Sequence, residues 1–407
     1  MFERIVIVGA GQAAVQAIDT LRRQGFTGHI SLIGAEPLLP YQRPPLSKKF
    51  LAGTLSRERL LLRPAAFYEQ HAVATRLGRR VEEIERREQR LRLDDGSSVA
   101  YDALLLATGS RARPLAMPGT DLAGVFSLRT VADVEQIRPA LTPGARLVIL
   151  GGGYIGLEVA ATARGLGVEV TILELAPRII ERVTCSAVAE FYAAEHVRHG
   201  VHIVCGVRAR AILAQAGEAR VRAVLTEEGG EYAADAVLLG VGALPEQELA
   251  ANAGLACENG IQVDEYCRST DPVIYAAGDC ASHPSRHYAR RLRLESVDNA
   301  FEQGVTAGLN LLGRDVVHDK VPWFWSDQYD LKLVIVGINT GYDEVVLRGD
   351  PAARAFSACY LRSGELIAID SINTPKDQLA ARKLIPARAR PDRARLADPS
   401  IALQATC

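Results

Sequence analysis

The chain has 407 residues, of which 48% are hydrophobic and 23% are charged, as is ordinary for a soluble globular protein. This length exceeds what one hydrophobic core supports and predicts roughly two or three domains. Lys and Arg number 47 against 48 Asp and Glu, and the net charge of −1 argues against nucleic-acid binding through overall charge. No apolar run approaches the roughly 18 residues of a transmembrane helix, so no membrane partner is expected.

The N-terminus runs almost directly into a predicted strand, which leaves no room for a signal peptide and predicts a cytoplasmic location. The 7 cysteines are scattered, odd in number and nowhere spaced as C-x-x-C. This pattern predicts neither a redox pair nor a zinc site, and no metal site is expected. Free thiols in a reducing compartment are the simpler interpretation.

The first nucleotide-binding pattern follows the apolar run 5–8, which predicts a strand. Gly9, Gly11 and Ala14 occupy the three small positions of G-x-G-x-x-G/A, and a helix with an apolar face follows them. In such a turn the first glycine permits a tight bend, the second admits a pyrophosphate, and the third small residue allows helix and strand to pack. The pyrophosphate then lies at the positive end of the helix.

A second strand, 29–33, leads to Glu36, and a proline-rich loop over 39–48 ends at Lys48. Short β-like stretches then precede a strand at 103–107, which Thr108 and Gly109 close. Prolines shortly after that strand mark a linker between the first unit and the next.

The pattern recurs after the apolar run 147–150, where Gly151, Gly153 and Gly156 hold the small positions. Glu36 and Glu174 lie about 20 residues beyond the two patterns, as dinucleotide-binding units require. Each copy follows a strand and opens a helix, so a purely structural glycine turn explains the pair poorly. Two nucleotide sites on one chain predict a hydride passed from one cofactor to the other.

Glu174 bears on the choice of nicotinamide. A carboxylate at this position accepts hydrogen bonds from the ribose hydroxyls and repels a 2′-phosphate, which predicts NADH rather than NADPH. Arg178 and Arg182 lie further on and are interpreted as surface residues of the following segment.

The apolar segment 273–277 leads into Gly278 and Asp279 and predicts a return to the first domain. From about Pro322 the pattern changes to short β runs, at 331–336, 344–347, 355–361 and 366–370. The predicted fold class is therefore α/β, with two Rossmann-like nucleotide-binding domains and a small α+β domain at the C-terminus.

Three features each have two interpretations. Lys48 and Glu158 could form an ion pair beside a flavin or could be solvated surface charges. Asp279 could bind the ribityl chain of a flavin or could be a turn or helix-capping residue. Trp323 and Trp325 are the only tryptophans, and on a strand both would point to one face, as a flavin wall or as core of the third domain.

Other chemistry finds little support in the sequence. No cysteine precedes Cys185, which argues against a disulfide reductase, and no Ser-His-Asp or metal-ligand arrangement is present. Hydride transfer between cofactors needs alignment and charge tuning from the protein rather than an acid or a base.

Several motifs together resemble the FAD-dependent ferredoxin reductases of the glutathione-reductase-like type. This is the family of putidaredoxin reductase and of the reductase components of biphenyl-type dioxygenases. The resemblance runs essentially end to end, and the segments that carry it are 9–14, 41–48, 107–109, 128–130, 151–161, 278–279, 322–328 and 395–399.

The resemblance implies an FAD-binding domain made of 1–111 and 244–320, an NAD-binding domain over 112–243, and a C-terminal domain over 321–407 that covers the flavin. It also implies NADH as electron donor and an acidic 2Fe–2S ferredoxin as acceptor. That ferredoxin would serve a cytochrome P450 or a Rieske-type ring-hydroxylating dioxygenase.

The motifs and the resemblance together give the candidate site residues, of which Lys48, Glu158 and Trp325 would be catalytic. FAD would contact Gly9, Gly11, Ala13, Ala14, Glu36, Arg43, Lys48, Val81, Thr108, Gly109, Arg129, Asp279, Val297 and Trp325. NAD would contact Gly151, Gly153, Tyr154, Ile155, Gly156, Glu158, Glu174 and Gly242.

If the ferredoxin is acidic, a basic rim would speed its encounter, although solvated surface charge is an equal interpretation. The candidates are Arg286, Arg290, Arg291, Arg293, Lys332, Arg382 and Lys383. Two other functions stay open: a flavin-binding signalling protein like apoptosis-inducing factor, and an NADH-dependent reductase of a small oxidant such as monodehydroascorbate. The near-neutral charge and the expected lack of a targeting peptide weigh against the first.

Overall fold

The computed structural model describes residues 2–407, which divide into two compact units. Unit 1 contains the residues up to Gln42, Arg57–Arg111 and Ala243–Lys320. Unit 2 contains Arg43–Ser56, Ala112–Gly242 and Val321–Cys407. The chain thus crosses between units several times, and the loop that holds Lys48 belongs with unit 2.

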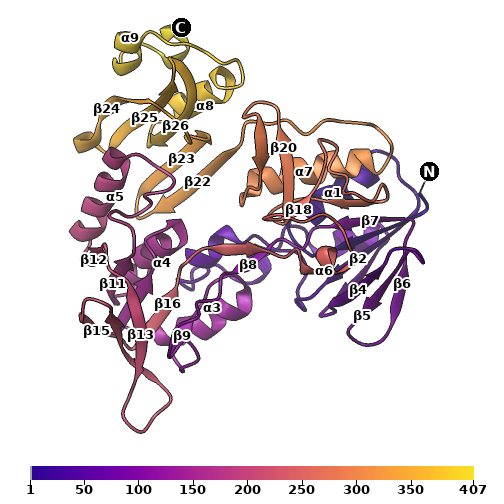
Figure 1. Ribbon diagram of the computed structural model, residues 1–407, viewed down its shortest axis with the longest axis horizontal. Helices are drawn as coiled ribbons and strands as arrows, with labels where there is room; N and C mark the ends of the chain where they lie inside the picture. The colour runs from indigo at the N-terminus through magenta and orange to yellow at the C-terminus, as the bar shows by residue number, and fades with distance from the viewer. Residues whose placement is uncertain (1) are drawn as a thin grey trace. The chain divides into compact units, whose positions relative to one another are not determined.

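Unit 1 is built on a five-stranded parallel sheet (Figure 1). Its order is β19 (Ile274–Ala276), β7 (Ala103–Leu106), β1 (Arg4–Val8), β2 (His29–Gly34) and β3 (Val73–Leu77). Ile5 and Ile7 of β1 pack into one core cluster, whereas Val6 and Val8 pack into another on the opposite face. The strand is buried on both faces, which explains its continuous apolar run.

Two helices cover one face of this sheet and pack against each other, namely α1 (Gln12–Arg23) and α7 (Val297–Asn310). The antiparallel sheet of β4 (Val81–Glu85), β5 (Arg90–Leu93) and β6 (Ser98–Ala100) contributes Val81 and Leu91 to the core of the other face. The remaining elements of unit 1 are α2 (Ala65–Gln70), α6 (Glu248–Asn252), β18 (Ile261–Gln262), β20 (Ala281–Ser285) and β21 (Arg290–Leu292).

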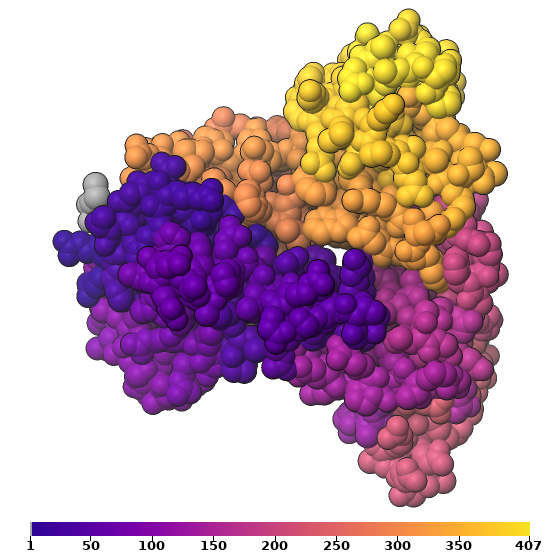
Figure 2. All heavy atoms as spheres, turned by 180° about the vertical axis from the view of Figure 1, so that it is seen from behind, coloured from indigo at the N-terminus to yellow at the C-terminus, as the bar shows by residue number. Residues whose placement is uncertain are grey.

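Unit 2 repeats the parallel design in residues 112–242. Its sheet has the order β12 (Val201–Cys205), β11 (Glu169–Glu174), β10 (Arg146–Leu150), β16 (Ala236–Leu239) and β9 (Val125–Phe126), with helices α3 (Val131–Ile137), α4 (Tyr154–Gly165) and α5 (Ser186–Arg198). An antiparallel sheet of β13 (Ala209–Ala214), β14 (Val221–Thr226) and β15 (Glu231–Ala233) ends in a hairpin that projects from this unit, shown in pink in Figure 2.

The C-terminal part of unit 2 is an antiparallel sheet with two short helices. The strand order is β22 (Trp323–Gln328), β23 (Leu331–Gly337), β26 (Glu365–Ile372), β25 (Ala355–Arg362) and β24 (Glu344–Asp350), followed by α8 (Pro375–Leu384) and α9 (Arg393–Ala397). This sheet packs on α5, where the ring of Phe191 lies 5.1 Å from that of Phe356. The predicted α/β class, with two Rossmann-like units and an α+β C-terminal part, is confirmed.

Short segments complete the chain. The proline-rich loop contains the 3₁₀ helix η1 (Pro44–Ser47), and β8 (Ser110–Ala112) pairs with β17 (Ala243–Pro245) where the chain changes unit. Within residues 2–407, no helix has both the length and the apolar character that a membrane crossing demands.

Candidate active site

The first glycine turn lies between β1 and α1, and its three small positions differ in what surrounds them. Gly9 has a φ of +106°, and a Cβ on it would lie 2.1 Å from the carbonyl oxygen of Ala107. Gly11, by contrast, has no atom of the described chain within 4 Å of its would-be Cβ. Ala14 is fully buried between helix and sheet. Of these three positions, Gly11 is the one with open space beside it, where a ligand could approach the backbone.

The second turn, between β10 and α4, repeats this division. Gly151 has a φ of +108°, and its Cβ would lie 2.5 Å from the carbonyl oxygen of Gly240. A Cβ on Gly156 would lie 2.3 Å from the carbonyl oxygen of Gly151, so close packing excludes a side chain there. Gly153 again has open space where its Cβ would be. Both turns therefore share a first glycine with positive φ and an open second position, and both pack closely at the third position, where the first turn has Ala14 and the second has Gly156.

The helices that follow the two turns have free N-termini. No side chain caps α1 or α4, and neither has an acidic residue in its first turn. In contrast, Thr130 caps α3 and Ser296 caps α7 by accepting from backbone N–H groups. Uncapped N–H groups beside an open glycine fit a pyrophosphate. The residues present at both turns thus suit a dinucleotide.

Further residues gather at the carboxyl ends of the unit 1 strands. A Cβ on Gly278 would lie 3.3 Å from Cβ of Ala13, which places the segment after β19 beside the first turn. Asp279 accepts a hydrogen bond from Ser110 Oγ at 2.8 Å. Thr108 donates to the carbonyl oxygen of Glu246 at 2.6 Å. Ligands of doubly wound folds bind at this edge of the sheet.

The two acids that follow the turns have different partners. Glu36 accepts a hydrogen bond from the hydroxyl of Tyr41 at 2.5 Å. Glu174 accepts from the backbone N–H groups of Gly152, at 2.6 Å, and Ala176, at 2.7 Å. The Glu174 carboxylate is therefore held against the second glycine turn.

The ion pair considered for Lys48 and Glu158 is present in unit 2. Lys48 Nζ lies 2.6 Å from Glu158 Oε2, and the two side chains are 18% and 6% exposed. Solvated surface charge is therefore not the right description of either residue. The pair forms because the segment Arg43–Ser56 packs on α4, where Thr162 donates to the carbonyl oxygen of Ser47 at 2.8 Å.

Two serines that sequence analysis did not single out complete the environment of Glu158. Ser47 donates to Oε2 at 2.5 Å, and Ser326 of β22 donates to Oε1 at 2.7 Å. Both carboxylate oxygens are thus hydrogen-bonded, as a buried charge requires. A lone serine carries no sequence signal for such a role, although Ser47 does directly precede Lys48.

The two tryptophans lie on one face of β22, as predicted for a strand. Their ring centroids are 5.5 Å apart, and the guanidinium of Arg382 lies 3.9 Å from the ring of Trp323. Both rings are half-buried against the hydrophobic core of the C-terminal part. Core packing therefore accounts for part of their role, and contact of Trp325 with a flavin stays a prediction.

The other predicted contact residues occupy varied settings. Arg43 donates to the carbonyl oxygen of Arg129 at 2.6 Å, which ties two of them together in unit 2. The ring of Tyr154 lies 4.9 Å from that of Phe324, and burial raises the pKa of its hydroxyl. Ile155 is 48% exposed. The remainder are Val81, buried in the unit 1 core, Val297 at the start of α7, and Gly109 and Gly242, which have φ values of +74° and +102°.

One expectation for the basic rim is wrong. The side chain of Arg293 is only 11% exposed, because it pairs with Glu295 and donates to the carbonyl oxygen of Asp279. Arg291 donates to the backbone carbonyl of Val263 at 2.7 Å, yet this residue is exposed. Arg293 therefore holds local structure and is not part of a solvent-facing rim, whereas the exposed Arg291 remains a candidate for it.

The described residues offer no other redox or metal centre. No group of three or more His, Cys, Asp or Glu in residues 2–407 is arranged to hold a metal ion. All 7 cysteines are free thiols, and burial raises the pKa of the Cys267 and Cys280 thiols, which disfavours the nucleophilic thiolate form.

Comparison with known proteins supports the sequence resemblance. A family model described as pyridine nucleotide-disulphide oxidoreductase matches residues 3–304, and one described as reductase C-terminal matches 323–407. Rhodocoxin reductase from Rhodococcus erythropolis is 42% identical over 381 residues, covering 94% of this chain and 89% of the relative. The ferredoxin–NAD(+) reductase component of an anthranilate 1,2-dioxygenase system from Burkholderia cepacia is 43% identical over 402 residues, 98% of each chain.

A solved structure is similar to this chain over almost its whole length. The crystal structure of a covalent putidaredoxin reductase–putidaredoxin complex matches with a TM-score of 0.96 and 40% identity, covering 99% of this chain and 97% of the other. The resemblance to ferredoxin reductases stated from the motifs is therefore confirmed.

Proposed function

We propose that this chain, which belongs to the pyridine nucleotide-disulphide oxidoreductase family, carries electrons from NADH through FAD to a 2Fe–2S ferredoxin. The observation that carries the proposal is the pair of glycine turns, each with one open position beside an uncapped helix N-terminus. Its relatives that are named for this activity match over nearly their full length.

Each unit supplies one nucleotide site. In the proposed arrangement, FAD binds to the domain of 1–111 and 244–320, NADH binds to 112–243, and 321–407 form the C-terminal domain. When bound, FAD would supply the conversion between the two-electron hydride of NADH and the single electrons that an iron–sulfur acceptor takes. FAD is held by the first turn with Glu36, Thr108, Gly109 and Asp279, and NADH by the second turn with Glu174.

The Lys48–Glu158 pair supplies fixed charge to this transfer. Lys48 is held in place by the Glu158 carboxylate at 2.6 Å, and its ammonium group offers a positive charge where two electrons and a proton arrive together. A preorganised charge of this kind stabilises a transition state without reorganising during the reaction. We assign these roles, together with the flavin contacts of Arg43, Arg129 and Trp325, by resemblance to the family.

Disulfide chemistry, which the family name includes, is not proposed for this chain. The 7 cysteines are unpaired, and none stands in the first 184 residues, where a redox pair beside the first helix would lie. Free thiols throughout also fit the reducing environment of the cytoplasm, which we propose as its location.

The electron acceptor is proposed to be an acidic ferredoxin that serves a cytochrome P450 or a ring-hydroxylating dioxygenase. Both kinds of system appear among the names of its relatives and structural counterparts. The exposed basic residues Arg286, Arg290, Arg291, Lys332 and Lys383 remain candidates for an encounter surface. A steep fall in ferredoxin reduction with added salt would support that surface, and turnover that ignores salt would contradict it.

A direct test uses the purified holoprotein. We expect a yellow protein that consumes NADH rapidly when a 2Fe–2S ferredoxin and cytochrome c are present. Rapid NADH consumption with monodehydroascorbate alone would favour the small-oxidant reductase, and no turnover with either would favour a signalling protein. Colourless protein that takes up no FAD would overturn the proposal.

A further inference from the structure

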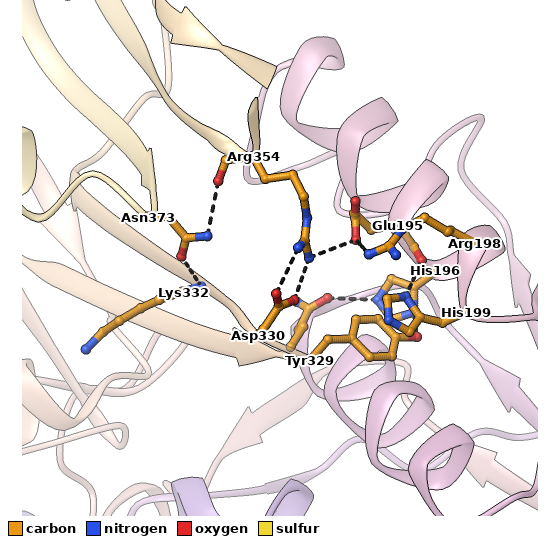
Figure 3. A network of polar contacts seen from close by, with 10 residues as sticks. Glu195, His196, Arg198, His199, Tyr329, Asp330, Lys332, Arg354 and Asn373 are labelled. Atoms are coloured by element: carbon orange, nitrogen blue, oxygen red, sulfur yellow. Dashed lines mark hydrogen bonds and ion pairs between the residues drawn. The ribbon is translucent and has the colours of Figure 1, made fainter. Parts of the chain in front are cut away.

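A buried chain of hydrogen bonds leads away from Glu158 toward helix α5. Ser326 donates to Glu158 Oε1 at 2.7 Å and accepts from Gln328 Nε2 at 3.1 Å. Gln328 Oε1 lies 2.8 Å from His196 Nε2, and His196 Nδ1 lies 3.0 Å from the hydroxyl of Tyr329. Figure 3 shows the outer end of this chain, where Tyr329 meets His196 on α5. Ser326, Gln328 and His196 are all at most 1% exposed.

The chemistry of the groups fixes a direction for this chain. Burial raises the pKa of Tyr329, so its hydroxyl keeps its proton and donates it to His196 Nδ1. Burial also lowers the pKa of His196 to about 4, so the ring is neutral and carries its single proton on Nε2. That proton is donated to Gln328 Oε1, and the Gln328 amide donates in turn to Ser326. Every donor therefore points toward the Glu158 carboxylate.

The residues that β22 contributes to this chain of hydrogen bonds lie on one face of the strand. Ser326 and Gln328 are buried, whereas Asp327 between them is exposed. Trp323 and Trp325 lie on the same face as Asp327, since side chains alternate along a strand. One strand thus carries the tryptophans on one side and the polar link between Glu158 and α5 on the other.

Tyr329 holds a backbone conformation that its residue type does not favour. It is the first residue of the two-residue turn between β22 and β23, with a φ of +56°. Gly or Asn is preferred in such a turn position. Arg354 (φ +57°) and Asn373 (φ +53°) belong to the same polar network (Figure 3). Strained residues persist where the surrounding structure or the function requires them. We therefore attribute the presence of tyrosine at position 329 to the contacts of its side chain and not to the needs of the turn.

We propose that Tyr329, His196 and Gln328 are positioning residues, which act through Ser326 to fix the Glu158 carboxylate and thereby the Lys48 ammonium group. The inference rests on the proposed function, in which the Lys48–Glu158 pair serves hydride transfer. It adds residues from α5 and the C-terminal sheet to a site that the motifs placed on α4 and the proline-rich loop.

The division of the Glu158 oxygens explains how positioning works. Ser326 takes Oε1, which leaves Oε2 for Lys48 and Ser47. Without the donor on Oε1, only the contacts on Oε2 hold the carboxylate against rotation about its last bond, and the position of Lys48 is less closely defined. Hydrogen bonds that run in one direction also polarise one another, so each link strengthens the next.

Single-turnover kinetics of the holoprotein test the proposal. Gln328→Met breaks both neighbouring links at nearly constant volume, and Tyr329→Phe removes one hydroxyl while keeping the ring stacked on His199. We expect the limiting rate of flavin reduction by NADH to fall about 10-fold in Gln328→Met and about 3-fold in Tyr329→Phe, within the roughly 100-fold that a 1 Å misplacement causes. The dissociation constant for NADH should stay unchanged.

A matched control separates positioning from general packing. Asp330→Asn weakens the pairing of Asp330 with Arg354, which also reaches Glu195 on α5, but leaves every link of the chain in place (Figure 3). We expect its rate to stay within about twofold of the unaltered protein. Equal losses in Asp330→Asn and Gln328→Met would overturn the proposal.

A readout that does not depend on turnover is the ¹⁵N NMR signal of the His196 ring, identified by its absence in His196→Gln. We expect the neutral Nε2–H tautomer from pH 5.5 to 8.5 and a shifted signal in Tyr329→Phe. A ring that titrates near its ordinary value, or that carries its proton on Nδ1, would contradict the direction of the chain.

Two further variants keep this inference separate from the proposed function. Glu158→Gln must slow hydride transfer if the ion pair serves that transfer. If the rate is unchanged, the proposed role of the ion pair is wrong. In that case the NMR signal of His196 still tests whether the chain of hydrogen bonds exists. If Glu158→Gln slows transfer but Gln328→Met does not, only the positioning inference fails. Ser326→Ala should slow transfer, and Ser326→Thr, which keeps the hydroxyl, should restore most of the rate.

Discussion

The two glycine turns of this chain share one backbone design but differ at an equivalent helix position. Gln16 lies seven residues after Gly9, and Glu158 lies seven residues after Gly151. Both side chains are buried, at 8% and 5% exposed. Gln16 packs against α7, where a Cβ placed on Gly304 would lie 2.9 Å from the Cβ of Gln16. Glu158 instead meets Lys48, Ser47 and Ser326.

This difference shows that the fold does not demand a charge at that position. A neutral amide satisfies it in the first copy, whereas a buried carboxylate carries a desolvation penalty that only good partners offset. Three partners drawn from a distant loop and from the C-terminal sheet have assembled around Glu158. Chemistry rather than stability therefore accounts for the charge in the second copy.

The most severe test places the same charge in the first copy. Gln16→Glu would bury a carboxylate at a position where the only hydrogen bond described for Gln16 is a 3.5 Å contact to Thr20. We expect a loss of about 3 to 5 kcal/mol in the free energy of unfolding, because no cation compensates the charge. Urea unfolding at pH 8 measures this loss, and Gln16→Met serves as the control. Equal unfolding free energies for Gln16→Glu and Gln16→Met would show that burying a carboxylate at this position costs little.

A second buried carboxylate in unit 2 tests the same penalty through pH. Asp370 accepts hydrogen bonds from Thr184 and Tyr360 on Oδ2, its Oδ1 has no hydrogen-bond partner among residues 2–407, and no cation pairs with it. Burial raises its pKa from 3.8 to about 6. Between these values the folded state binds more protons than the unfolded state, so stability falls as pH rises and then levels off above pH 6.

The Asp370→Asn variant should remove this dependence. We expect Asp370 to lower stability by on the order of 3 kcal/mol above pH 6 relative to pH 4. His196 acts in the opposite direction, because its lowered pKa means that stability is lost as pH falls from 6.5 toward 4. The difference in unfolding free energy between the unaltered protein and Asp370→Asn, measured from pH 4 to 8, isolates the carboxyl group. If this difference in unfolding free energy did not change with pH, the raised pKa of Asp370 would be refuted.

The glycines of the first turn should separate folding from binding. Gly9→Ala introduces a side chain at a φ of +106° and against a carbonyl oxygen, so we expect it to destabilise the apoprotein by about 2 kcal/mol or more. Gly11→Ala meets no protein atom, so we expect apoprotein stability within about 0.5 kcal/mol but a large loss of bound FAD. Absorbance of the flavin and thermal unfolding report the two effects. Normal flavin content in Gly11→Ala would show that the open space beside Gly11 is not part of the FAD site.

The sequence predicted the repeated strand, turn and helix because β1 and β10 are buried on both faces and their glycines have steric reasons to be there. It could not predict which segments surround Glu158. Ser47 and Ser326 lie 111 and 168 residues away along the chain, and single serines or histidines carry no periodic signal. The Lys48–Glu158 pair was one of two open interpretations, since packing of the loop Arg43–Ser56 on unit 2 is a tertiary property.

The smallest expected effect distinguishes the two acids that follow the turns. Glu174→Gln removes one negative charge next to the second turn and keeps one acceptor for the N–H of Gly152 or Ala176. We expect kcat/KM for NADPH to rise about 10-fold relative to NADH, since the removed repulsion at a partly exposed site is of order 1 kcal/mol.

The control is the corresponding change in the first copy. Glu36→Gln alters a group that accepts from Tyr41, and we expect it to weaken FAD binding without changing the preference between NADH and NADPH. Added salt should narrow the NADH preference of the unaltered protein more than that of Glu174→Gln, because screening acts on the charge that the variant lacks. If Glu36→Gln shifted the preference as much as Glu174→Gln, the assignment of one nucleotide to each turn would have to be abandoned.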